Sequence, residues 1–219
     1  MSEPRPRPPA HHLTVSRTAR YYLAGAETGA REVWFVLHGY SQLAAGFLRW
    51  FEPAVHPGRL IVAPEALSRA YFEEKSARRV GASWMTREDR EAEIEDYVRY
   101  LDQLADSVIP GLPPRPRIEL HGFSQGCATA GRWATYGRHA FSRVVLWGGT
   151  APPDLDLERL RSNLRSAPIV LAVGDRDPFV TAEHVRAEEA RLRGIGLTVE
   201  SRLFPGGHSV DRTTLAALA

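Results

Sequence analysis

The sequence contains only one cysteine, Cys127, among its 219 residues. A single cysteine excludes a disulfide framework and a zinc site built from several cysteine ligands. The sequence also lacks an uninterrupted apolar run of about 18 residues, the length that predicts a helix crossing a bilayer. Residues 1–9 alternate proline with charge and have no apolar core, so they do not predict a secretory signal peptide. We therefore expect a cytoplasmic protein without a membrane span.

Lysine is also scarce, because Lys75 is the only lysine among 28 basic residues. These are balanced by 26 acidic residues, which leaves a net charge of +2. Arginine suits phosphate contacts, so an arginine-rich chain raises the question of nucleic-acid binding. The arginines are dispersed and interleaved with acidic residues, as in 87–91, whereas a nucleic-acid surface requires them clustered. We therefore expect no nucleic-acid partner.

The remaining composition is that of a folded globular domain. Hydrophobic residues make up 43% and charged residues 25% of the sequence, which excludes a disordered chain, a collagen and a coiled coil. The length suits one domain, and neither a repeat nor a low-complexity linker divides the chain. We expect a loose Pro/Arg-rich tail over residues 1–12 and a single domain over 13–219, present as a monomer or homodimer.

Short apolar runs alternate with helical patterns along the chain. Expected strands are residues 33–37, 60–63, 117–120, 144–147, 169–173 and 197–204, preceded by β structure within 13–23. Expected helices are residues 43–50, 87–107, 125–136, 182–193 and 210–218. This alternation, with strands that read as continuous apolar runs, predicts an α/β fold built on a mostly parallel sheet. Five of the six strands reach a glycine within two residues of their carboxyl ends, and that edge is where such sheets bind ligands.

Residues 122–126 read Gly-Phe-Ser-Gln-Gly and match the pattern G-x-S-x-G. An expected strand leads into this segment and a helix rich in small residues leads out of it. That setting is typical of a nucleophile elbow, in which a sharp turn exposes the serine hydroxyl at the sheet edge. The alternative is a tight turn with an incidental serine. Ser124 becomes a candidate nucleophile if the sequence also provides a base and an acid.

His208 is the candidate base, because it alone among the eight histidines follows both the elbow and an acidic loop at a strand end. The acid is either Asp175 or Asp177, both of which follow the strand 169–173. Asp175 lies nearer the strand end and could brace the loop, whereas Asp177 lies further out, where it could reach a histidine. Spacing alone leaves both open. The order serine, aspartate, histidine is the order found in α/β-hydrolases.

His38-Gly39-Tyr40 follows the first of the buried strands. In such folds this loop supplies one oxyanion-hole N–H and the residue after the nucleophile supplies the other. We assign these donors to the backbone of Tyr40 and Gln125, whose side chains need not take part. His38 either orients the loop by hydrogen bonding or is a packed structural histidine. This chemistry requires no metal and no organic cofactor.

Together these motifs resemble the phospholipase/carboxylesterase family of small α/β-hydrolases, which includes bacterial carboxylesterases and acyl-protein thioesterases. The resemblance runs from about residue 32 to 210. It implies an α/β-hydrolase fold with helices on both faces of the sheet, and the short loops leave no room for a large cap domain. It also implies that Asp177 is the triad acid and that a tryptophan-containing segment, here residues 83–85, lies beside the acyl site.

The sequence departs from the family pattern at three places. The family often reads H-G-x-G-D where residues 38–42 read His-Gly-Tyr-Ser-Gln, and it usually has a second glycine after the elbow where this chain has Cys127. We expect Cys127 to be a small buried filler. The segment 64–80 is the least similar, and we expect it to form a flap over the site. Its Tyr71 and Phe72, together with Trp84, are candidate pocket residues.

These residues predict a serine carboxylesterase that hydrolyses short-to-medium acyl esters through an acyl-enzyme intermediate. The expected partner is a small-molecule or lipid-like ester. A thioesterase or lysophospholipase with the same triad is one alternative. A non-catalytic binding protein on a hydrolase fold is an alternative from another class.

Overall fold

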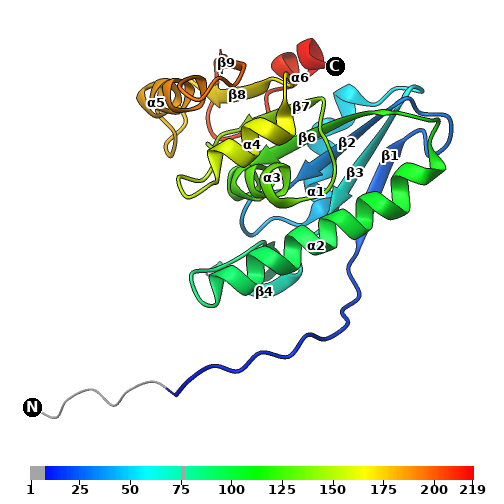
Figure 1. Ribbon diagram of the computed structural model, residues 1–219, viewed down its shortest axis with the longest axis vertical. Helices are drawn as coiled ribbons and strands as arrows, with labels where there is room; N and C mark the ends of the chain where they lie inside the picture. The colour runs from blue at the N-terminus through cyan, green and yellow to red at the C-terminus, as the bar shows by residue number, and fades with distance from the viewer. Residues whose placement is uncertain (1–7, 75–76) are drawn as a thin grey trace, which may run out of the picture.

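The computed structural model describes residues 8–74 and 77–219 (Figure 1). The first residues of the expected tail, 1–7, lie outside that part. Residues 8–20 contain neither helix nor strand, so the β structure expected within 13–23 begins only with β1, Tyr21–Gly25. The reason is that Leu13 and Val15 are 85% and 71% exposed and bury little apolar surface.

Seven strands form the main sheet in the order β1-β3-β2-β6-β7-β8-β9 (Figure 1). Besides β1, they are β2 Glu32–Leu37, β3 Arg59–Pro64, β6 Arg117–Phe123, β7 Arg143–Trp147, β8 Ile169–Gly174 and β9 Val199–Phe204. Only β1 runs antiparallel to its neighbour, and the other pairs are parallel. The expected mostly parallel sheet is therefore confirmed.

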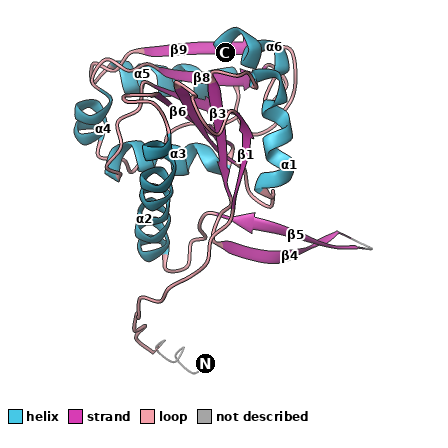
Figure 2. Ribbon diagram, turned by 90° about the vertical axis from the view of Figure 1, so that its right-hand side faces the viewer, coloured by secondary structure: helices cyan, strands magenta, loops and turns pink. Residues whose placement is uncertain are grey.

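Helices cover both faces of this sheet, as expected of the fold (Figure 2). They are α1 Ala44–Leu48, α2 Arg90–Val108, α3 Gln125–Tyr136, α4 Leu157–Leu164, α5 Ala182–Arg193 and α6 Arg212–Leu218, with 3₁₀ turns at Arg49–Ala54 and Ile109–Gly111. One apolar core packs α2, α3, α4 and α5 against the sheet. The other packs α1, the first 3₁₀ turn and α6 against the opposite face. Within the described ranges, no helix is both long and apolar enough to cross a membrane.

The segment 64–80 contributes to a β-hairpin that the sequence did not reveal. Its strands, β4 Ser68–Glu74 and β5 Ala77–Ser83, pair antiparallel and form a second small sheet. The hairpin projects away from the body of the protein (Figure 2). Its base is joined to the loop after β2 by an isolated bridge between Gln42 and Ala82. In the part of the chain that the structure describes, no large cap domain covers the sheet edge.

The strand order has a topological switch point at β2. β3 lies on one side of β2 and β6 lies on the other, so the chain reverses its direction of travel across the sheet at β2. In open α/β sheets ligands bind at such a reversal, because the loops leaving the two strands diverge. The loop after β2 holds residues 38–42, and the turn after β6 holds Ser124. The fold thus brings the two most suggestive motifs to the same place.

Candidate active site

Ser124 occupies a sharp turn between the last residue of β6 and the first residue of α3. Its backbone has φ 53° and ψ −116°, a strained conformation for a residue with a side chain. Both flanking glycines are required sterically. A Cβ atom on Gly122 would lie 2.3 Å from the carbonyl oxygen of Gly126, and one on Gly126 would lie 2.3 Å from that of Leu37. This is the geometry of a nucleophile elbow.

His208 and Asp177 form a hydrogen-bonded pair, and the His208 ring packs against Phe123, the residue before Ser124, with ring centroids 4.7 Å apart. Nδ1 of His208 lies 2.7 Å from Oδ2 of Asp177, whose side chain is fully buried. The other carboxylate oxygen, Oδ1, accepts hydrogen bonds from the N–H groups of Phe179 at 2.8 Å and Val180 at 3.1 Å. Because an ionised carboxylate only accepts hydrogen bonds, Nδ1 carries the proton and Nε2 is left as a base.

Asp175 makes different contacts, although it is only two residues away. Its Oδ1 accepts a hydrogen bond of 2.9 Å from the N–H of Gly206, and its carboxylate lies 3.5 Å from the Arg176 guanidinium. It therefore links the loop after β8 to the loop after β9. The histidine contact belongs to Asp177, the aspartate that the family resemblance implies as the acid, while the catalytic role itself stays a prediction.

The two backbone donors expected for an oxyanion hole are both available. Among the described residues, neither the N–H of Tyr40 nor that of Gln125 donates to an acceptor. The preceding N–H, that of Gly39, is occupied by Oε1 of Gln42 at 2.7 Å. Gln42 is itself held by a hydrogen bond from the N–H of Ala82 to its carbonyl oxygen. The loop is thus fixed in a shape that leaves the Tyr40 N–H open.

Ser41 explains how this loop keeps its shape despite departing from the family pattern. Its φ is 61°, in the left-handed region that favours glycine, and it stands where the pattern H-G-x-G-D has its second glycine. Backbone hydrogen bonds hold it there, since its N–H donates to the carbonyl oxygen of Ala82 at 2.9 Å. The hairpin base therefore helps to hold a strained residue next to the oxyanion donors.

His38 is fully buried and orients the same loop. Its Nδ1 lies 2.7 Å from the carbonyl oxygen of Gly39, and its Nε2 accepts a hydrogen bond of 3.1 Å from the N–H of Ala66. Both interpretations of this residue therefore apply, because it is packed and it also positions the loop. Burial lowers the pKa of His38, which keeps the ring neutral and Nε2 able to accept.

The pH dependence of folding stability should reveal this neutral histidine. Because the native pKa is below the ordinary value of about 6.5, the unfolded chain binds the proton more readily. The stability that the neutral His38 contributes is fully present above about pH 6.5. It falls as the pH drops toward the native pKa, by at most about 1.4 kcal/mol per pH unit. Urea unfolding of the parent and His38→Gln at about pH 7.5 and 5.5 tests this. We expect the variant to be less destabilised, relative to the parent, at the lower pH, whereas an equal difference at both would contradict the prediction.

The three expected pocket residues lie in different surroundings. Trp84 is 3% exposed, and its Nε1 donates to the carbonyl oxygen of His38 at 2.8 Å. It therefore supports the oxyanion loop from within the core. Phe72 packs edge-on against Tyr40 with ring centroids 5.2 Å apart. Tyr71 is 67% exposed on the hairpin. The structure therefore brings Phe72 and Trp84 to the loop, and contact of the three with substrate stays a prediction.

The side chain of Gln125 has a structural function that the motif did not suggest. Its Nε2 donates to the Ser83 hydroxyl at 3.1 Å and to the Met85 carbonyl at 2.9 Å, and its Oε1 accepts from the N–H of Trp84 at 3.1 Å. It thereby ties the elbow to the segment 83–85. Cys127 is fully buried as expected, and burial raises the pKa of its thiol well above the ordinary range.

Two aromatic residues also contact His208, and no sequence motif predicted them. The rings of Phe123 and Phe179 lie 4.7 Å and 4.8 Å from the His208 ring, measured between centroids. Phe123 is nearly buried, whereas Phe179 is 69% exposed. Both are variable positions of the motifs, in G-x-S-x-G and after Asp-Pro. Sequence patterns therefore gave no signal for them.

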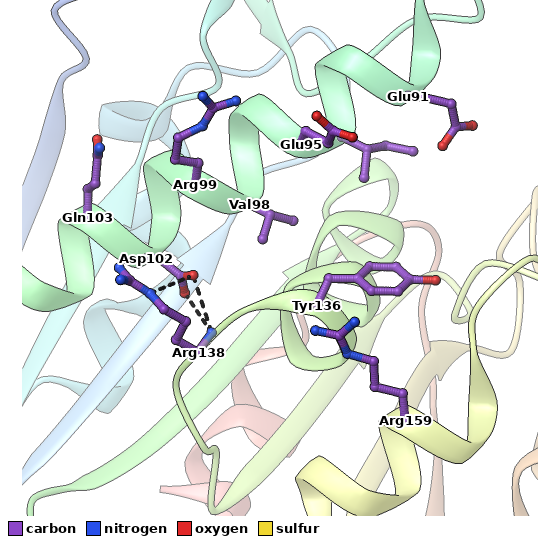
Figure 3. Close-up of a pocket in the computed structure, with 10 residues that line it drawn as sticks. Glu91, Glu95, Val98, Arg99, Asp102, Gln103, Tyr136, Arg138 and Arg159 are labelled. Atoms are coloured by element: carbon purple, nitrogen blue, oxygen red, sulfur yellow. Dashed lines mark hydrogen bonds and ion pairs between the residues drawn. The ribbon is translucent and has the colours of Figure 1, made fainter.

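A groove of about 760 Å³ lies elsewhere, between α2, the end of α3 and α4 (Figure 3). Its lining includes Val98, Tyr136 and an ion pair between Arg138 and Asp102. None of Ser124, Asp177 and His208 lines it. Over the ranges that the structure describes, no three histidine, cysteine, aspartate or glutamate residues gather closely enough to hold a metal ion.

Comparisons with known proteins give the family and the fold of the chain. The sequence profile of the Phospholipase/Carboxylesterase family matches residues 24–219. Similar solved structures are acyl-protein thioesterase 2 of Zea mays (17% identity, 92% of this chain and 96% of that chain, TM-score 0.67), the Bacillus cereus carboxylesterase (14%, 91% and 91%, 0.66) and SOBER1 of Arabidopsis thaliana (19%, 86% and 96%, 0.68). At such low identities these structures show a shared fold. No curated protein matches the sequence significantly.

Proposed function

Because the chain belongs to the phospholipase/carboxylesterase family of hydrolases, we propose that it is a serine carboxylesterase whose triad is Ser124, His208 and Asp177. The observation that carries the proposal is the 2.7 Å contact between His208 Nδ1 and Asp177 Oδ2 beside the strained elbow serine. A buried acid, an imidazole with a free Nε2 and a serine held in a sharp turn are the groups that nucleophilic acyl transfer requires.

In the first half of the reaction, the Ser124 hydroxyl attacks the ester carbonyl while Nε2 of His208 takes its proton. Asp177 stabilises the imidazolium that forms and keeps the ring in the productive tautomer. The N–H groups of Tyr40 and Gln125 donate to the oxyanion, and each such donor contributes about 3 kcal/mol of transition-state stabilisation. The imidazolium then gives its proton to the leaving alcohol, and Ser124 remains acylated.

In the second half, water attacks the acyl-enzyme. His208 removes a proton from the water, the same oxyanion donors stabilise the second tetrahedral intermediate, and His208 returns the proton to Ser124 as the acid leaves. Each step uses side chains and backbone groups of this chain.

We propose short-to-medium acyl esters as substrates. The competing activity is that of a thioesterase, which is favoured by one observation, the likeness to the structure named acyl-protein thioesterase 2. Lysophospholipids are a third substrate class for the same triad.

Hydrolysis of a matched ester, thioester and lysolipid with the same acyl group tests this assignment. We expect kcat/KM for the ester to exceed the other two at least tenfold, a difference of about 1.4 kcal/mol in transition-state binding. A faster thioester would reassign the protein as a thioesterase with the same mechanism. Failure to hydrolyse any of the three would favour a binding protein on a hydrolase fold.

A further inference from the structure

An exposed aromatic side chain lies against the proposed catalytic base. Phe179 packs edge-on against the His208 ring with centroids 4.8 Å apart, and it is 69% exposed. Its backbone is fixed, because its N–H donates to Oδ1 of Asp177 at 2.8 Å. The triad acid thus holds both the histidine, through Oδ2, and the segment that carries this phenyl ring.

Phe179 is one end of a series of aromatic ring contacts. His208 also contacts Phe123 at 4.7 Å, and Phe123 contacts Trp50 at 5.2 Å, again between ring centroids. Phe123 is nearly buried and Trp50 is half-buried, so Phe179 is the most exposed member. Exposed apolar surface next to a reactive group is available to bury against a ligand, which is favourable by about 25 cal/mol per Å².

The mechanism determines which part of an ester meets this surface. Nε2 of His208 must come within about 3 Å of the leaving oxygen to protonate it. Nδ1 is already engaged by Asp177, so the alcohol part of the substrate lies on the Nε2 side of the ring. An apolar group a few bonds beyond the leaving oxygen could pack on the exposed Phe179 ring, whose centroid is 4.8 Å from that of the imidazole.

We infer that Phe179 is a specificity-determining residue that binds the alcohol part of the ester. The substrate class it selects is esters of apolar, planar alcohols, such as arylmethyl or aryl esters, whose ring packs on Phe179 as the leaving oxygen meets His208. Aromatic pairs of this kind add about 0.5–1.5 kcal/mol beyond the area they bury. This inference rests on the proposed function, because it requires that His208 protonate the leaving group.

A purely structural role would have a different signature. If Phe179 only shielded the His208–Asp177 hydrogen bond from water, its loss would impair acylation and deacylation alike, whatever the alcohol. A leaving-group contact acts only in acylation, because the alcohol has departed before water attacks. Esters that share an acyl group pass through the same acyl-enzyme, so deacylation separates the two roles.

The test compares benzyl butyrate with methyl butyrate, whose alcohols are of similar acidity. For Phe179→Ala in the full chain, we expect the ratio of kcat/KM for benzyl over methyl ester to fall at least tenfold, with Phe179→Leu in between. The rate of butyryl-enzyme hydrolysis, measured after a p-nitrophenyl butyrate burst, should change less than twofold. Val55→Ala removes an exposed apolar side chain just before β3, at the opposite edge of the sheet, and is the matched control.

An unchanged benzyl-to-methyl ratio, or an equal loss in acylation and deacylation, would overturn the inference while leaving the esterase intact. If the parent hydrolysed neither ester and gave no acyl-enzyme burst, the proposed function would fail instead. Thermal unfolding of each variant checks that folding is retained, as expected for a side chain that is mostly exposed.

Discussion

Replacing Ser124 with alanine is expected to lower kcat for ester hydrolysis by about 10⁶-fold, the size of effect seen when a triad nucleophile is removed. Without the hydroxyl no acyl-enzyme forms, and only binding and the oxyanion donors remain to assist direct attack by water. Folding should be retained, because no described residue forms a hydrogen bond with the Ser124 hydroxyl and alanine adopts the same backbone with comparable strain. Steady-state hydrolysis of p-nitrophenyl butyrate, with circular dichroism as the folding check, measures both effects.

A fluorophosphonate label provides a second readout that does not depend on the substrate chosen. The parent should be labelled once, at Ser124, and Ser124→Ala should not be labelled. Ser142→Ala is a matched control, because Ser142 lies just before β7, at the opposite edge of the sheet, and its exposed hydroxyl donates to the carbonyl oxygen of Ile118. Activity of Ser124→Ala within tenfold of the parent would disprove the assignment of the nucleophile.

The elements that the sequence predicted well have patterns determined by burial on one or both faces. α3 and α5 begin and end where expected, and β2, β3, β7 and β8 match their apolar runs closely. The hairpin of β4 and β5 was missed because β4 mixes aromatic, small and charged residues and β5 mixes apolar, small and charged residues, neither with strict alternation. α4, Leu157–Leu164, was missed because the helix is short and because a single residue, the N-cap Asp156, marks its start.

The candidate site also has parts that the sequence predicted and parts that it did not. Ser124 and His208 could be predicted because glycines mark their loops and the chain order is constrained. The contacts around them could not, because they depend on how separate loops meet. Trp84 holds the oxyanion loop by a hydrogen bond to His38 across 46 residues, and Phe179 meets His208 across 29 residues. No local pattern specifies such meetings.

The second large effect concerns the acid. Asp177→Asn should lower kcat by about 10⁴-fold, the loss seen when the triad acid becomes an amide in a serine protease. The structure indicates which way the new amide would turn. The N–H groups of Phe179 and Val180 both point at Oδ1, so the amide oxygen must stay there and the NH₂ group must face Nδ1 of His208. Nδ1 then has to accept, Nε2 carries the proton, and the base is lost.

Asp175→Asn is the matched control, because the same chemical change falls two residues away. The amide oxygen can still accept the hydrogen bond from the N–H of Gly206, and only the weak ion pair with Arg176 is lost. Exposed ion pairs contribute about 0–1 kcal/mol, so turnover should stay within tenfold of the parent and the melting temperature should fall by a few degrees at most. Turnover and melting temperature of both variants decide the assignment. If Asp175→Asn were the inactive enzyme and Asp177→Asn nearly unimpaired, the triad would be wrong at its third member, because the hydrogen bond to His208 would then not be the one that orients the base.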